Sequence, residues 1–322
     1  MRPRPAGNQT VAVDGQQASS GRWSCLGLAG LFLVGLWIAA TLASAVDRAS
    51  RTVVVADLRP HGPIHTAADG RLVFVTGGTG PEAADGQVVA FDATNRTTTT
   101  LLAELRRPLA ADLSPSGEAC AITEQDGDRP SSLICSTGLT VNLDAYAIDN
   151  RASFQPEGGA RPADVVSDGQ EGWYVSEATS ASILHVDRRG TIAAVATSTA
   201  FLRASPIGLA RDGDKIWYAI AEYGIGGFQT GAASHEIRGG QWVESGLAMA
   251  LTPRSSLVVP FVLMRERYGT QGWVTYQVMV DAQHPRVVDG LVGPQGLALL
   301  PDGRLAIVAN GQLILYRPGS RP

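Results

Sequence analysis

A polar residue recurs at one point of a repeating pattern in this chain, directly after the second strand-like run of each repeat. The residues are Glu124, Glu177, Glu222 and Asn310, with Glu266 displaced by a few positions. If equivalent ends of neighbouring sheets surround a channel, these side chains form an acidic ring at its mouth that could attract a cation or a basic partner. The competing interpretation is turn chemistry, because a polar residue beside glycine ends a strand and begins a bend. The sequence favours the turn and leaves the ring open.

Other motifs that carry chemistry are absent from the sequence. It contains no nucleotide-binding loop, no Cys/His zinc spacing and no Gly-x-Ser-x-Gly elbow. The five histidines show no ligand spacing and are expected in turns or sheets: His61, His65, His185, His235 and His284. Only 17% of the residues are charged and the net charge is −4, which argues against a nucleic-acid partner. We therefore expect no cofactor, no metal and no nucleic acid.

Two of the three cysteines lie in consecutive strand-like runs, Glu118–Thr123 and Ser132–Ser136. A hairpin that pairs Ile122 with Leu133 places Cys120 opposite Cys135. Directly opposed residues come close enough for a disulfide in the non-hydrogen-bonded register. The alternative is two buried free thiols. A disulfide would indicate an oxidising compartment.

The elements that position these residues repeat along most of the chain. Similar stretches begin at Pro63, Pro108, Pro162, Pro206, Gly246 and Pro294, about 45 residues apart. The first and third copies each contain four short strand-like runs, and no helical pattern intervenes. This predicts an all-β fold, a six-bladed β-propeller over residues 52–318. The sixth copy has only three runs, so we expect Thr52–Asp57 to supply its fourth strand and close the ring.

The N-terminal region reads differently. Residues 1–24 are polar and irregular, and we expect disorder there. Leu26–Val46 is uncharged, and at about 1.5 Å per residue it spans a hydrocarbon core of roughly 30 Å. We expect a single transmembrane helix over 25–46, preferably an uncleaved signal anchor, although Ala43-Ser44-Ala45 also fits signal-peptide cleavage after Ala45. The flanking arginines are nearly balanced, and the candidate disulfide favours an extracytoplasmic C-terminal domain at the cell membrane.

The repeats, written Pro-x-Gly-Leu-Ala and Pro-Asp-Gly-Arg-Leu as at Pro294–Leu305, resemble those of the NHL-repeat and gluconolactonase-like six-bladed propellers. They are also similar to the extracytoplasmic ScyD/ScyE-type propellers. The resemblance covers residues 52–318. It implies the fold strongly and the function weakly, because these motifs are mainly strand and turn signals.

The gluconolactonase-like resemblance implies a divalent metal on the propeller axis, held by Glu, two Asn and Asp. The matching frames of this chain carry His61, Ala163, Ile207 and Ser245 at those positions. Alanine and isoleucine offer no side-chain oxygen, and serine cannot act as the base at neutral pH. Only Asp164, beside Ala163, survives as a polar group. The resemblance therefore does not carry the family's activity to this chain.

From the sequence we expect a membrane-anchored extracytoplasmic propeller that binds a protein or an envelope polymer and has no catalytic residues. Its channel-mouth binding residues would be His61 and Asp164, together with the acidic series. The alternative is a hydrolase or lactonase with an altered site, which carboxylates converging on the channel would favour.

Overall fold

The computed structural model describes residues 51–317 apart from 56, 81–82, 154, 156, 171, 199–204, 213–214, 221–223, 230–234, 238–245, 251–260, 266–270 and 277–285. The chain divides into two units, Met1–Ser50 and Arg51–Pro322. The expected tail at 1–24 and membrane helix at 25–46 lie outside the described residues. Within those residues, no helix has the length and apolar character needed to cross a bilayer.

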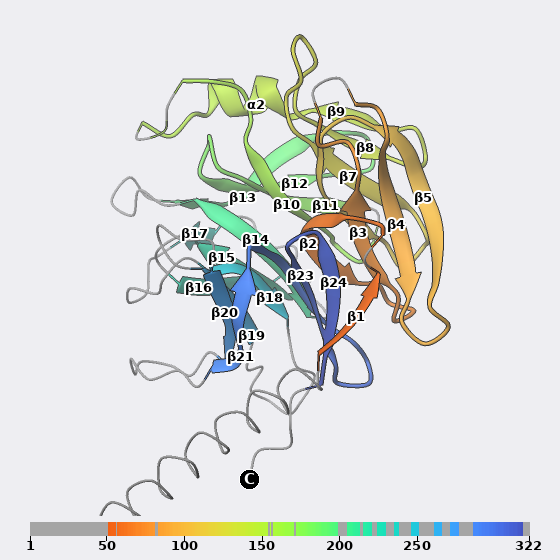
Figure 1. The fold of residues 1–322 in the computed structure, drawn as a ribbon. Coiled ribbons are helices and arrows are strands. Elements are labelled where there is room, and N and C mark those ends of the chain that lie inside the picture. Colours follow the sequence, from red (N-terminus) through yellow and green to blue (C-terminus); the bar gives the residue numbers. More distant parts are fainter. Residues whose placement is uncertain are drawn as a thin grey trace, which may run out of the picture. The chain divides into compact units, whose positions relative to one another are not determined.

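The second unit consists of β-sheets in a propeller arrangement (Figure 1). Two complete four-stranded sheets come first: β2 Pro60–Thr66, β3 Leu72–Thr76, β4 Gly86–Asp92 and β5 Thr97–Leu105, then β6 Pro108–Leu113, β7 Ala119–Thr123, β8 Ser132–Cys135 and β9 Thr140–Asn142. Two more have the same form: β18 Gly246–Ala250, β19 Phe261–Arg265, β20 Gln271–Tyr276 and β21 Arg286–Val292, then β22 Pro294–Leu299, β23 Leu305–Ala309, β24 Gln312–Tyr316 and β1 Arg51–Val55.

Two further sheets depart from four strands. One has five, β10 Pro162–Ser167, β11 Trp173–Glu177, β12 Ser182–Val186, β13 Ile192–Ser198 and β17 His235–Ile237, and the other has three, β14 Pro206–Asp212, β15 Lys215–Ile220 and β16 Gly224–Gln229. The repeats predict six four-stranded blades, whereas four are complete in the described part of the chain. The difference arises at β17, which follows β16 in the chain but pairs in parallel with β13 of the preceding sheet.

The first strands of the six sheets contact one another in cyclic order: β2, β6, β10, β14, β18, β22 and again β2. Each is an edge strand of its own sheet, so one side of each has no sheet partner. Five of them begin at the predicted residue, and β2 begins three residues before the predicted Pro63. The periodicity of the sequence thus locates the strands that line the centre.

A bulge recurs near the start of these central strands. In β6, β10, β14, β18 and β22 the register shifts between the first and third residues, and in β2 it shifts between His61 and His65. A bulge bends its strand and redirects the side chains beside it. Ala163 and Ile207 are the second residues of β10 and β14, so two of the positions compared with metal ligands lie at bulges.

The predicted closing strand is confirmed. β1 pairs antiparallel with β24, Val53 opposite Ile314, and joins the two ends of the unit. The apolar side chains of β23 and β24, including Val308, Leu313 and Leu315, are buried with Phe74 of the first sheet. Strand β1 therefore covers the edge of the last sheet. The hydrophobic core of that sheet is continuous with the core of the first sheet.

One short helix, α2 Leu143–Asp149, was not predicted. It follows β9 and begins at Asn142, whose side chain accepts a hydrogen bond from the backbone of Asp144 at 2.8 Å. Leu143 and Ala147 bury its inner face in the core shared by the second and third sheets. An N-cap asparagine and one apolar stripe suffice for two turns, which is too little for a clear helical period.

Candidate functional site

An ion pair crosses the centre of the described structure. His65 on β2 contacts Asp164 on β10, with 2.8 Å between Nε2 and Oδ1. These residues belong to the first and third sheets, so the pair joins two sheets that are separated in the sequence by the second sheet. The side chains are 11% and 1% exposed. A buried pair of this kind fixes the relative position of two sheets that share no backbone ladder.

Two carboxylates satisfy backbone groups on the open edges of the next central strands. Asp164 Oδ2 accepts a hydrogen bond from the Leu209 backbone N–H on β14 at 2.7 Å. Asp112 on β6 accepts one from the Ser167 backbone N–H on β10 at 2.9 Å. Buried N–H groups need acceptors, and an inner edge strand has no neighbouring strand to provide them. These aspartates therefore tie the second sheet to the third and the third to the fourth.

The charges in this cluster are strongly coupled. Burial by itself would lower the pKa of His65, but the charge and hydrogen bond of Asp164, with the charge of Asp112, raise it to about 9. Burial raises the pKa of Asp112, opposed by the His65 charge and by backbone hydrogen bonds. At neutral pH His65 is thus an imidazolium. It can donate hydrogen bonds or stabilise negative charge, but it cannot accept a proton as a general base.

A cavity of about 120 Å³ adjoins this cluster. Its polar walls come from His65, Thr66, Asp112 and Arg211, on the first, second and fourth sheets. Thr66 donates a hydrogen bond to the Leu299 carbonyl on β22 at 2.9 Å and so ties the first sheet to the sixth. Water occupies roughly 30 Å³ per molecule in the liquid, and ligand pockets usually reach about 300–1,000 Å³. The cavity therefore has room for a few waters.

The acidic series occupies different surroundings. Glu177 is fully buried at the end of β11 and accepts hydrogen bonds from the backbone N–H groups of Arg161, Thr179 and Ser180. Glu124 is partly exposed, pairs with Arg107, and lines a groove of about 460 Å³. Asn310 is exposed in the β23–β24 turn with a positive φ of 51°.

Glu177 accepts hydrogen bonds from backbone N–H groups of the bend after its strand, and Asn310 itself forms such a bend. Turn chemistry therefore accounts for both residues. Glu222 and Glu266 lie outside the described residues, so the acidic ring stays a hypothesis.

The residues compared with a metal site do not form one within the described structure. His61 contacts the Pro108 carbonyl through Nε2 at 2.9 Å, and its buried Nδ1 has no partner among the described residues. One free nitrogen offers one ligand, and neither Ala163 nor Ile207 adds another. Ser245 lies outside the described residues. Asp164, the remaining polar group, is occupied by His65 and backbone N–H groups.

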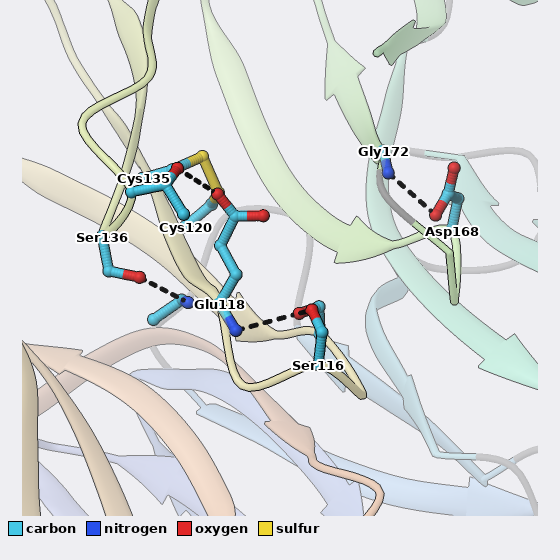
Figure 2. The surroundings of a disulfide bond; sticks show 10 residues. Ser116, Glu118, Cys120, Cys135, Ser136, Asp168 and Gly172 are labelled. Atoms are coloured by element: carbon cyan, nitrogen blue, oxygen red, sulfur yellow. Dashed lines mark hydrogen bonds between the residues drawn. A yellow bond between two sulfur atoms is a disulfide. The ribbon is translucent and has the colours of Figure 1, made fainter. Parts of the chain in front are cut away.

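The two strand cysteines lie opposite each other in the register inferred above. Cys120 pairs with Cys135 and Ile122 with Leu133 across β7 and β8, and a disulfide joins the cysteines. Figure 2 shows the bond with the Glu118 carboxylate beside it. Glu118, Cys120 and Cys135 form the one cluster of metal-ligand types in the part of the chain that the structure describes. Because both sulfurs are in the disulfide, the cluster lacks the thiolates that bind metals.

Sequence reasoning missed the central roles of His65, Asp112 and Arg211. A signal was present for the aspartate, because Asp112 interrupts the apolar run Ala110–Leu113 of a predicted central strand. A charged residue inside a buried strand must have a partner. The partners come from other sheets, and sequence spacing does not reveal which ones.

Comparisons with known proteins support the fold alone. No family model matches the chain, and no curated protein matches it. Among solved structures, a gluconolactonase from Xanthomonas campestris is 12% identical with a TM-score of 0.54, over 83% of this chain and 89% of that one. A Thermus thermophilus protein described as an oxidoreductase of the glucose dehydrogenase type is 12% identical with a TM-score of 0.51, over 83% and 98%.

Hydrazine synthase from Kuenenia stuttgartiensis is 14% identical with a TM-score of 0.50, over 79% of this chain and 75% of that one. The three names describe three unrelated chemistries on similar architecture. A shared propeller therefore does not assign an activity, which has to be argued from the residues of this chain.

Proposed function

We propose that this chain is a six-bladed β-propeller, anchored by Leu26–Val46 on the extracytoplasmic side of a membrane, that acts by binding a protein or an envelope polymer. The cyclic order of six first strands supports the blade count. In that reading the three-stranded sheet β14–β16 is the fourth blade. The Cys120–Cys135 disulfide supports an oxidising compartment, and the uncharged segment supports the anchor.

The observation that supports a binding role is that the central ionisable groups are engaged in contacts between sheets. His65, Asp112 and Asp164 contact one another or backbone N–H groups of neighbouring blades, and the adjoining cavity is about 120 Å³. Groups committed to inter-blade ties are not free to activate a nucleophile, and a few waters' volume does not admit a metabolite. Recognition then falls to the outer surface.

A hydrolase or lactonase with an altered site is the second candidate. It is favoured by one specific observation, the convergence of two carboxylates and an imidazole on the centre. Against it stands the raised pKa of His65, which keeps this imidazole protonated at neutral pH, while Asp112 and Asp164 accept hydrogen bonds from backbone N–H groups of neighbouring sheets. In this alternative the catalytic groups would have to release their backbone partners during the reaction.

One preparation tests both candidates. The full chain is extracted with a mild detergent and purified, co-purifying components are identified, and the complex is rebuilt from separately purified parts. A stoichiometric partner that rebinds supports the proposal. The same preparation is assayed for hydrolysis of sugar lactones. Lactone turnover by the purified chain, with no partner retained, would overturn the proposal in favour of the enzyme.

A further inference from the structure

Four turns of the second and third blades lie at one end of their sheets. In an antiparallel four-stranded sheet the turn between the first and second strands and the turn between the third and fourth strands share an end. Here these turns are the β6–β7 and β8–β9 turns of the second blade and the β10–β11 and β12–β13 turns of the third. We call this end the first-turn face. The acidic series follows second strands and so lies at the opposite end.

Two grooves lie on this face. One, of about 490 Å³, is lined mainly by the second blade, including Ser116, Glu118 and Thr137, and the other, of about 560 Å³, by the third blade, including Asp168, Gln170 and His185. Arg188 lines both. Each groove falls within the usual size of a ligand site.

The turn that carries Arg188 reaches across the seam between the blades. A side chain at Gly190 would lie 3.2 Å from Val141 and 3.5 Å from Leu139, both on the second blade. The turn of the third blade is therefore seated against its neighbour. As a result the two grooves adjoin at Arg188, and a ligand longer than one groove can extend from one blade to the next.

The groove of the third blade is held in a fixed geometry before any ligand arrives. Asp168 accepts hydrogen bonds from the backbone N–H groups of Gln170 at 2.7 Å and Gly172 at 3.0 Å, and its Oδ2 lies 3.0 Å from His185 Nε2. Figure 2 shows the Gly172 contact. Despite the opposing effect of burial, these bonds lower the pKa of Asp168.

Gly172 is needed for that arrangement. A Cβ atom there would come within 2.5 Å of Asp168 Oδ2 and 2.6 Å of His185 Nε2, so both side-chain ends would have to shift. The observed Asp168–His185 geometry thus requires a glycine beside the pair. Pre-organised polar groups lose less entropy when they bind a ligand.

The charges of the two grooves nearly balance. Their carboxylates are Glu118, Asp168 and Asp187, and their guanidinium groups are Arg188 and Arg189. With so small an excess of one sign the face creates little attraction for a polyanion or polycation. What it presents instead is a dense set of donors and acceptors, to which Ser116, Ser136 and Gln170 add hydroxyls and an amide.

We propose that these adjoining grooves bind a neutral, polyhydroxylated polymer chain, an oligosaccharide in chemical class. Vicinal hydroxyls both donate and accept, and they match the paired atoms of carboxylate, guanidinium and amide groups. Trp173 and Tyr174 are buried, so stacking on these rings does not contribute and each sugar unit binds weakly. A polymer compensates by occupying both grooves. This inference rests on the proposed binding function and chooses the envelope polymer over the protein.

The test uses the full chain in a detergent without a sugar headgroup, because alkyl glycosides would compete. Calorimetric titration with chitohexaose and with cellohexaose supplies the neutral probes, and hexagalacturonate supplies an acidic one. A neutral hexasaccharide should bind with an affinity that salt leaves unchanged. Gln170→Ala/Arg189→Gln removes one exposed amide and replaces an exposed guanidinium with a shorter, neutral amide, and the affinity should fall about tenfold.

The matched control is Gln125→Ala/Arg129→Gln, two exposed residues of the same types on the β7–β8 connection at the opposite end. It should bind as the unaltered chain does. Failure to bind either neutral hexasaccharide, equal losses in both double variants, or binding of hexagalacturonate alone that salt abolishes would overturn the site. A rebuilt protein complex that the groove variant leaves unaffected, together with failure to bind either neutral hexasaccharide, would overturn the site while leaving the proposed binding function intact.

Discussion

At the residue scale, charged side chains at the centre accept backbone hydrogen bonds that a neighbouring strand would otherwise accept. Each first strand has a sheet partner on one side only, and a buried backbone N–H on its other side needs an acceptor. Asp112 and Asp164 reach forward to the following blades, and Thr66 reaches back to β22. His65 then offsets the negative charge. The same contacts that tie the blades also keep these residues from free solvent.

Breaking the central ion pair should destabilise the unit strongly. His65→Gln leaves Asp164 buried without a cation, and removing one member of a buried pair costs about 3–5 kcal/mol. We expect a loss of that size in the free energy of unfolding, measured by urea denaturation. Arg71→Gln, which breaks the more exposed Arg71–Asp69 pair, is the control and should cost about 0–1 kcal/mol. Similar small losses in both variants would contradict the structural role.

Stability should also fall as pH rises. The pKa of His65 is 6.5 when unfolded and about 9 when folded, so the folded state holds this proton more tightly. Its contribution is complete below pH 6.5 and is lost as pH increases through 9, by about 3 kcal/mol in total. Urea midpoints measured across that range should decline in the unaltered chain and stay flatter in His65→Gln. An equal decline of the urea midpoint with pH in the unaltered chain and in His65→Gln would show that other groups cause the pH dependence.

How much of the site the sequence could reveal depends on how local its contacts are. The turn interpretation of Glu177 and the opposition of Cys120 and Cys135 follow from neighbours in the chain, and both are present in the structure. The His65–Asp164 contact joins residues 99 apart, from sheets that are not adjacent in sequence. No periodicity encodes that distance, so sequence reasoning placed Asp164 near the channel and missed its partner.

At the element scale, proline and glycine made the strands predictable. Five central strands begin at the expected residues, four of them at proline and β18 at Gly246. Proline suits the first position of an edge strand, where no N–H is required. β2 starts earlier since its bulge lies between His61 and His65. Helix α2 and strand β17 were missed for another reason. Each is short, and its partners are chosen by packing between blades rather than by its own pattern.

The β7–β8 hairpin gives a prediction of its own. Its disulfide closes a loop of 15 residues, and a loop of that length corresponds to about 3 kcal/mol in the chain-entropy model. Cys120→Ala/Cys135→Ala should lower the free energy of unfolding by about that amount, while Cys25→Ala should not change it. In denaturant without reductant only Cys25 should be alkylated, and all three cysteines should react after reduction. Three alkylated cysteines before reduction would show that the bond is absent.

At the scale of the whole molecule, the ring is closed by its least local element. Among the strands that the structure describes, all others except β17 pair with neighbours in the chain, whereas β1 pairs with β24, the last of them. The cyclic contacts of the first strands show that the sheets return to their starting point. Because each blade buries its faces against its neighbours, an opening at one seam exposes apolar surface on both sides of it.

Deleting Thr52–Val55 from the full chain should therefore weaken the whole unit. The deletion uncovers the edge of β24 and removes Val55 from the core that contains Leu313 and Leu315. An uncovered edge strand is also a template for pairing with another chain. We expect a lower and broader thermal transition together with aggregation, followed by circular dichroism and light scattering.

Deletion of the four preceding residues, 47–50, controls for the shortened connection and should leave the transition unchanged. A peptide of sequence Arg51–Asp57 supplied in trans should restore part of the lost stability, because strand addition to an exposed edge needs only the backbone ladder and matching side chains. If the Thr52–Val55 deletion melts as sharply and at the same temperature as the unaltered chain, β1 is an appendage, and closure must come from contacts among the central strands alone.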